Sequence, residues 1–104
     1  MSAQTAVNVT SPTASVSVPR HVVYRSFPAE TVVLNLETGR YHGLNPPAGR
    51  MLGALEQAAS PRAAAAILAQ DYDQPRSVIE RDLCELCDAL AERGLVEIDE
   101  PRAP

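Results

Sequence analysis

Two cysteines three positions apart, Cys84 and Cys87, are the strongest candidates in the sequence for a redox or metal-binding pair. This spacing is typical of redox sites and of half of a zinc site. Redox cysteines of this kind lie at a helix N-terminus, where the helix dipole lowers the pKa of the thiol, whereas these two fall inside a long helical pattern. A structural zinc needs four ligands, and the histidines, His21 and His42, lie far upstream without paired spacing. We therefore predict that the cysteines pack inside a helix, and we expect no metal and no cofactor.

Arrangements typical of an enzyme are missing from the sequence. It contains no nucleophile elbow, no glycine-rich phosphate loop, and no cysteine and histidine with an orienting carboxylate. A reaction pocket would also occupy interior that a core of about 80 residues can scarcely spare. We expect a binding protein with no catalytic residues.

The composition indicates one small acidic domain. The chain has 104 residues, 45% of them hydrophobic, and its 9 basic residues, all arginines, stand against 13 acidic ones for a net charge of −4. This balance provides no broad cationic surface for a polyphosphate, so nucleic acid is a poor candidate partner. No segment reaches the roughly 20 apolar residues that span a bilayer, and no basic stretch followed by an apolar one opens the chain. We expect a cytoplasmic protein with neither a nucleic acid nor a membrane partner.

Three short strands are predicted between residues 22 and 44. The segments VVYRSF, TVVLNL and RYHGL alternate in polarity and are separated by a break at Pro28 and Ala29 and a turn at Thr38 and Gly39. If that turn is a two-residue hairpin loop, one register follows. It pairs Glu37 with Arg40, Leu36 with Tyr41, Asn35 with His42 and Leu34 with Gly43. It also gathers Leu34, Leu36 and Tyr41 on one face of a one-sided sheet and Asn35, Arg40 and His42 on the other.

Three helices follow the strands. Asn45 can cap the first, and Ser60 followed by Pro61 opens the second. The third begins between Pro75 and Ser77 and stops at Arg93 and Gly94. Apolar side chains recur at helical spacing and should face the core: Met51, Leu52 and Leu55 in the first helix, Ala64, Ile67 and Leu68 in the second, and Ile79, Leu83, Leu86, Cys87 and Leu90 in the third.

The predicted architecture is α+β, a three-stranded antiparallel sheet followed by three helices, which is a winged helix-turn-helix composition with the wing first. The ordered domain is expected over residues 19–98. Residues 1–18 are small and polar, so we expect a flexible N-terminal tail there and a second flexible tail over residues 99–104. The fold often binds DNA, but the last helix would repel a phosphate backbone because it carries Glu80, Asp82, Glu85, Asp88 and Glu92.

Two stretches, ETVVLNLETGRYHGLNPPAGRML and ERDLCELCDALAERGLVEI, resemble the PqqD-like family of RiPP recognition elements. The likeness covers residues 19–98, and it depends on the order and spacing of the strand-turn-strand LNLETGRYHGLN, the small pair Ala48 and Gly49, and the RGLV that closes the third helix. The resemblance implies a winged-helix domain that binds the leader segment of a ribosomally made precursor peptide. It further implies a separate modifying or cleaving enzyme, as in lasso peptide clusters, whose leader peptidase is a transglutaminase-like cysteine protease.

The physical basis of such binding would be an open sheet edge. The third strand would leave alternate N–H and C=O groups unpaired, and an added peptide strand would satisfy them, while side-chain pockets supply selectivity. In the family the pocket lies between the third strand and the third helix. Carried onto this sequence, the leader-binding residues are Arg40, Tyr41, His42, Gly43 and Leu44 on the strand, with Val78, Asp82 and Leu86 on the helix.

Each of these residues also has a purely structural interpretation. Tyr41 and Leu86 could be ordinary core residues. Gly43 could serve only to make room for Leu34 across the strand pair, and His42 and Asp82 could be solvated side chains. Two other functions remain open, a winged-helix DNA-binding regulator or other protein-interaction adaptor, and a small redox or zinc domain. Salt-dependent DNA binding would favour the first of these, and stoichiometric zinc the second.

Overall fold

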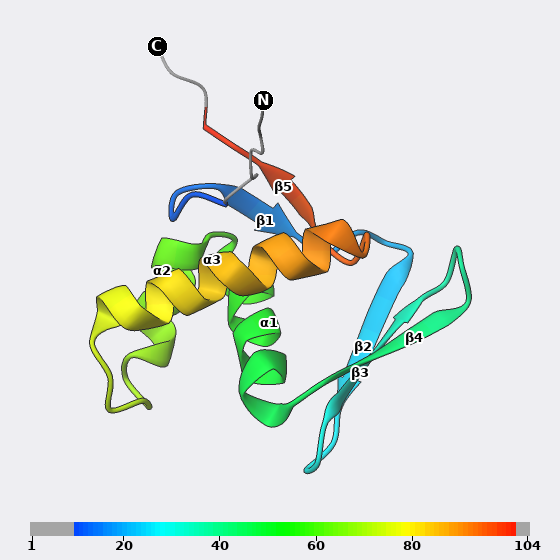
Figure 1. The fold of residues 1–104 in the computed structure, drawn as a ribbon, viewed down its shortest axis with the longest axis horizontal. Coiled ribbons are helices and arrows are strands. Elements are labelled where there is room, and N and C mark those ends of the chain that lie inside the picture. The colour runs from blue at the N-terminus through cyan, green and yellow to red at the C-terminus, as the bar shows by residue number, and fades with distance from the viewer. Residues whose placement is uncertain (1–9, 102–104) are drawn as a thin grey trace, which may run out of the picture.

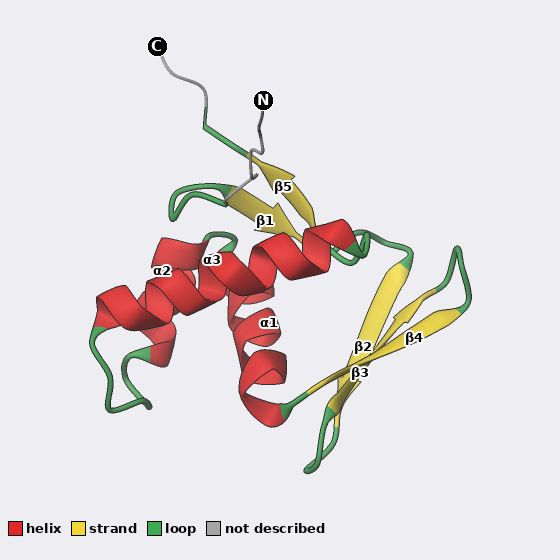
Figure 2. Ribbon diagram, in the orientation of Figure 1, coloured by secondary structure: helices red, strands yellow, loops and turns green. Residues whose placement is uncertain are grey.

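The computed structural model of this chain describes residues 10–101, which form five strands and three helices (Figure 1). In chain order they are β1 (Ser15–Ser17), β2 (Val22–Ser26), β3 (Thr31–Asn35), β4 (Arg40–Leu44), α1 (Pro46–Ala58), α2 (Pro61–Leu68), α3 (Arg76–Glu92) and β5 (Glu97–Asp99). The predicted order of three strands followed by three helices is confirmed. The helices gather on one side of the three-stranded sheet, and the short strands β1 and β5 lie above α3 (Figure 2).

The sheet β2-β3-β4 is antiparallel, as predicted, but the predicted hairpin register is wrong. Asn35 pairs with Arg40, and Leu34 with Tyr41, so the loop contains the four residues 36–39 instead of two. The side chain of Asn35 forms this longer loop, because its Oδ1 accepts the N–H of Glu37 at 2.9 Å. The backbone carbonyl of Asn35 accepts the N–H of Gly39, whose φ of 75° is readily adopted only by glycine.

The predicted grouping of Asn35, Arg40 and His42 on one face is confirmed, but the buried face of the sheet is not the predicted one. Leu34 and Tyr41 do share a face, but it points to solvent, and Leu36 lies in the exposed loop. The core face carries Val33 and Leu44. The physical reason is that β3 reads TVVLN, with apolar residues on both faces, so alternation by itself cannot choose the buried one.

The helix boundaries follow from the predicted caps. Asn45 accepts the N–H of Ala48 at 2.9 Å at the start of α1, and Ser60 accepts the N–H of Ala63 at 3.2 Å at the start of α2. After α3, Gly94 adopts a φ of 73°, which ends the helix as predicted.

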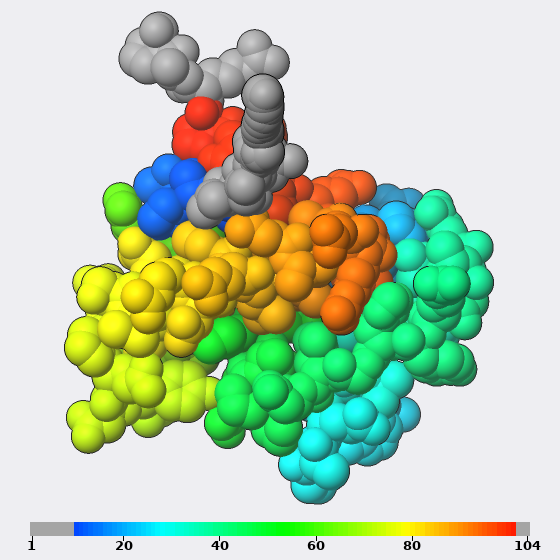
Figure 3. Space-filling model, in the orientation of Figure 1, coloured from blue at the N-terminus to red at the C-terminus, as the bar shows by residue number. Residues whose placement is uncertain are grey.

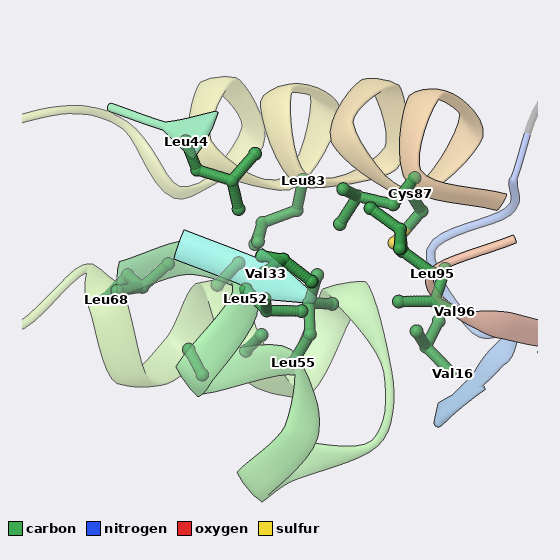
Figure 4. Close-up of a cluster of buried hydrophobic side chains, with 14 of the residues drawn as sticks. Val16, Val33, Leu44, Leu52, Leu55, Leu68, Leu83, Cys87, Leu95 and Val96 are labelled. Carbon is green, nitrogen blue, oxygen red and sulfur yellow. The ribbon is translucent and has the colours of Figure 1, made fainter. Parts of the chain in front are cut away.

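The core lies where α1, α2 and α3 meet the inner face of the sheet. Leu83 projects from α3 toward Leu52 of α1 and Val33 of β3, whereas Cys87 lies beside Leu95 (Figure 4). None of these side chains is more than 1% exposed. At one place the backbones come so close that a side chain has no room. A Cβ added to Gly49 of α1 would lie 2.0 Å from Oγ1 of Thr31 on β3, so α1 can lie this close to the sheet only because residue 49 is glycine.

The expected flexible N-terminal tail is wrong for residues 10–18, while residues 1–9 lie outside the described part of the chain. Strand β1 pairs with β5 near the C-terminus, and Val16 is 3% exposed between them and the helices. Thr10 donates from both its N–H and its hydroxyl to Asp88 of α3, at 2.7 and 2.6 Å. The ordered domain therefore begins before residue 19, because the alternating SVSV finds a partner strand about 80 residues later.

The second expected tail is ordered at its start. Asp99 belongs to β5, and Glu100 accepts the N–H and the hydroxyl of Ser11. Residues 102–104 lie outside the described part. The helices found between residues 10 and 101 include none long and apolar enough to cross a membrane.

Candidate functional site

Strand β4 has one open edge among the described residues, because it pairs only with β3. The direction of its backbone groups follows from the ladder. At the β2–β3 turn Phe27 donates its N–H to the carbonyl of Glu30 at 2.7 Å, so even-numbered residues of β3 bond toward β2 and odd-numbered ones toward β4. On β4, the N–H and C=O groups of His42 and Leu44 are then directed to β3, whereas the N–H of Arg40 donates to Oγ1 of Thr38 at 3.2 Å. Those of Tyr41 and Gly43 point to the open edge.

The five predicted strand residues divide between the two faces of the sheet. Arg40, His42 and Leu44 lie on the inner face, opposite Asn35, Val33 and Thr31, whereas Tyr41 and Gly43 lie on the outer face. Leu44 is 7% exposed and belongs to the core, while Tyr41 is 71% exposed, so the core interpretation of Tyr41 is wrong. His42 is half-buried rather than solvated.

The three predicted helix residues form one stripe along α3. Val78, Asp82 and Leu86 recur every four residues, and each is partly exposed beside the fully buried row that contains Leu83 and Cys87. Leu86 packs partly against the core. This stripe is therefore accessible to a ligand without being detached from the hydrophobic core.

Strand and helix approach one another at the buried end of β4. Leu44 and Leu83 belong to the same hydrophobic cluster (Figure 4), and the surface of β4, in green, lies beside that of α3, in orange (Figure 3). Within residues 10–101 no hydrogen bond or ion pair joins the predicted strand residues to Val78, Asp82 or Leu86. The described contact between strand and helix is therefore the one through the core, at Leu44 and Leu83.

The outer face of the sheet carries an apolar surface that the sequence analysis missed. Val23 is 46% exposed and Phe27 49%, and together with Val32, Leu34 and Tyr41 they line a shallow hollow. The period-two pattern of β2 and β3 could have indicated it, because both strands place apolar residues on both faces. The hollow borders the open edge of β4 at Tyr41.

A side-chain hydrogen bond at the surface joins the sheet to α1. The hydroxyl of Tyr24 on β2 donates to Oε1 of Glu56 on α1 at 2.5 Å. Burial, followed by this bond and the charge of Glu56, raises the pKa of Tyr24 to about 12. The phenol therefore remains a hydrogen-bond donor to Glu56 up to a higher pH than an unperturbed tyrosine would.

The cysteines are confirmed as packing residues of α3. Both thiols are free and buried, and Cys87 is fully buried in the core. Burial raises the pKa of Cys87 to about 12 and also raises the pKa of Cys84. Thiols in this environment are inert at neutral pH because the reactive thiolate is disfavoured. No three potential ligand side chains converge on a metal position anywhere in residues 10–101.

Fold and site together define a small α+β domain of winged helix-turn-helix composition, with one edge strand open beside a helix. Residues 30–96, more than half of the chain, match the family described as coenzyme PQQ synthesis protein D (PqqD). The chain belongs to this PqqD family.

Two solved structures are similar to this protein over most of its length. One is TbiB1 in complex with the TbiA(beta) leader peptide, which is 31% identical with a TM-score of 0.70 and covers 85% of this chain and 99% of that one. The other is lasso peptide synthetase B1 complexed with the leader peptide, which is 25% identical with a TM-score of 0.69 and covers 80% of this chain and 98% of that one. The comparison with curated proteins found no match.

Proposed function

We propose that this protein binds the leader segment of a ribosomally synthesised precursor peptide in lasso peptide biosynthesis. The observation that carries the proposal is the open edge of β4, where the backbone groups of Tyr41 and Gly43 are available to another strand. Membership of the PqqD family supports it, as do two similar structures that each contain a leader peptide. Such strand addition takes its affinity from backbone bonds and its selectivity from the adjoining side chains.

The proposed contacts are the residues predicted from the sequence. The leader would lie along residues 40–44, with Tyr41 and Gly43 as its backbone partners. Alternate leader side chains would then point inward, toward Val78, Asp82 and Leu86 on α3, because successive residues of a strand point to opposite faces. This arrangement uses the helix stripe that the core leaves partly exposed.

We further propose that the protein is not an enzyme and that it presents the bound leader to a separate one. In a lasso pathway this partner would be the transglutaminase-like cysteine protease that removes the leader. The cytoplasm is the expected location, because precursor peptides leave the ribosome there.

Calorimetry with the synthetic leader of the precursor encoded beside this protein's gene tests the proposal. One leader should bind per protein, and it should compete with the full precursor. Absence of both heat and competition would refute leader recognition.

Asp82→Arg tests the position of the site. Asp82 is half-buried on the proposed helix wall, and within residues 10–101 it has no ion-pair partner, so reversing its charge should barely change the melting temperature. Leader affinity should change at least several fold, and processing by the partner enzyme should change in parallel. Unaltered affinity in the folded variant, with leader-induced NMR shifts away from residues 40–44, would place the site elsewhere.

A further inference from the structure

Glu30 occupies an unusual position at the outer face of β4. It ends the β2–β3 turn, and it lies on the same face as Val32 because residues two apart on a strand point the same way. Gly43 on β4 is the partner of Val32. A Cβ added to Gly43 would lie 2.8 Å from Oε1 of Glu30, so the carboxylate fills the space that a side chain at position 43 would take.

This geometry changes the interpretation of Gly43. The predicted reason for glycine, clearance for Leu34, is wrong, because Gly43 pairs with Val32 and the group above it is the Glu30 carboxylate. Any larger residue at position 43 would displace the carboxylate from the edge strand.

The Glu30 carboxylate has no basic partner in the described part of the chain. The ion pairs among residues 10–101 are His21 with Glu37 and Arg62 with Glu80. Arg25 also lies on the outer face, but on β2, separated from Gly43 by Val32. Within residues 10–101 the Glu30 carboxylate thus forms no ion pair, and it lies next to the open edge on a face whose other charged group, Arg25, is on the far strand β2.

We propose that Glu30 is a specificity-determining residue that selects a leader with a basic side chain on the outer face beside Gly43; this inference rests on the proposed function. A strand added to β4 extends the row formed by Arg25, Val32 and Gly43. The leader residue that lies opposite Gly43 in this row meets no side chain from Gly43. If it is a lysine or arginine, its side chain can reach the carboxylate of Glu30, because diagonal neighbours in a sheet contact one another through long side chains.

A charge-swap experiment with the fluorescein-labelled leader of the neighbouring precursor tests this inference. Each leader position is changed in turn to Lys and to Glu, and binding is measured to the wild type, Glu30→Gln and Glu30→Lys. One position of the natural leader should be basic, and the leader variant with Glu at that position should bind the wild-type protein about 3- to 10-fold more weakly, as for a partly exposed ion pair. The same leader variant should bind Glu30→Lys more tightly than the natural leader does. Gly43→Ala should reduce this dependence on charge.

Glu37→Lys is the matched control, because it makes the same charge change in the β3–β4 loop, away from Gly43. It should leave the preference at every leader position unchanged. If the leader binds at β4 but no position reverses its preference with Glu30→Lys, or if Glu37→Lys produces the same reversal, the role of Glu30 is refuted while the proposed function stands. A leader that binds none of the proteins would refute both. If Glu30→Lys fails to fold, the comparison uses the wild type and Glu30→Gln. The inference is overturned if the Lys and Glu variants of the leader bind the wild type equally tightly and also bind Glu30→Gln equally tightly.

Discussion

Proline at Tyr41 tests strand addition directly, because it removes one backbone donor from the open edge. The N–H of Tyr41 points away from β3, so Tyr41→Pro breaks no bond of the existing ladder. The side chain is 71% exposed, so little packing is lost. Proline is tolerated at edge strands where its missing N–H would face solvent. We expect the folded state to persist, with a stability change of about 1 kcal/mol or less.

The effect on leader binding should be much larger than the effect on stability. Without the donor, one leader carbonyl becomes buried without a partner, which costs about 1–3 kcal/mol. Since 1.4 kcal/mol is tenfold in affinity, the Kd should rise roughly 5- to 150-fold. Fluorescence polarisation with labelled leader gives the Kd, and urea denaturation gives the stability of the same preparations.

Three variants separate the backbone effect from other causes. Tyr41→Ala removes the ring but keeps the N–H, so Tyr41→Pro must be compared with it. Ser26→Pro removes an N–H from the open edge of β2, and leader affinity should be unchanged. His42→Pro deletes a donor that β3 uses and should destabilise the fold itself. If folded Tyr41→Pro binds the leader within twofold of Tyr41→Ala, strand addition at β4 is wrong.

Two further predictions concern the framework that holds β4. Gly49→Ala should destabilise the protein by about 1–3 kcal/mol, because its Cβ would collide with buried Thr31. Gly53→Ala, in the same helix with nothing within 4 Å of the added carbon, should instead stabilise by up to about 1 kcal/mol; equal urea midpoints for the two variants would contradict the packing argument. Burial, followed by the bond to Glu56, raises the pKa of Tyr24 from 10.0 to about 12 on folding. The stability linked to the protonated phenol is therefore present below pH 10 and lost between pH 10 and 12. The stability difference between wild type and Tyr24→Phe should therefore shrink over that range, by no more than about 1 kcal/mol since the phenol is partly solvated, and a constant difference would contradict it.

Features that depend on near neighbours could be predicted from the amino-acid sequence. The caps Asn45 and Ser60 satisfy backbone donors three residues away, and Gly94 ends α3 through its own φ, so each could be identified without knowing the fold. The order of the three sheet strands and three helices, the packing of the cysteines and the choice of residues 40–44 as the open strand followed from the same local patterns and from the resemblance they carry.

Features that depend on partners distant in sequence, or on geometry that the alternation of side chains leaves open, could not be predicted in this way. Apolar residues on both faces of β3 left the buried face undetermined, and the side chain of Asn35 lengthened the hairpin loop and shifted the register. Strand β1 is ordered only because β5 lies beside it. The placement of the Glu30 carboxylate over Gly43 and the direction of the Tyr41 N–H depend on which residues pair across the sheet. Pairing is a property of two strands together, so neither strand's sequence specifies it alone.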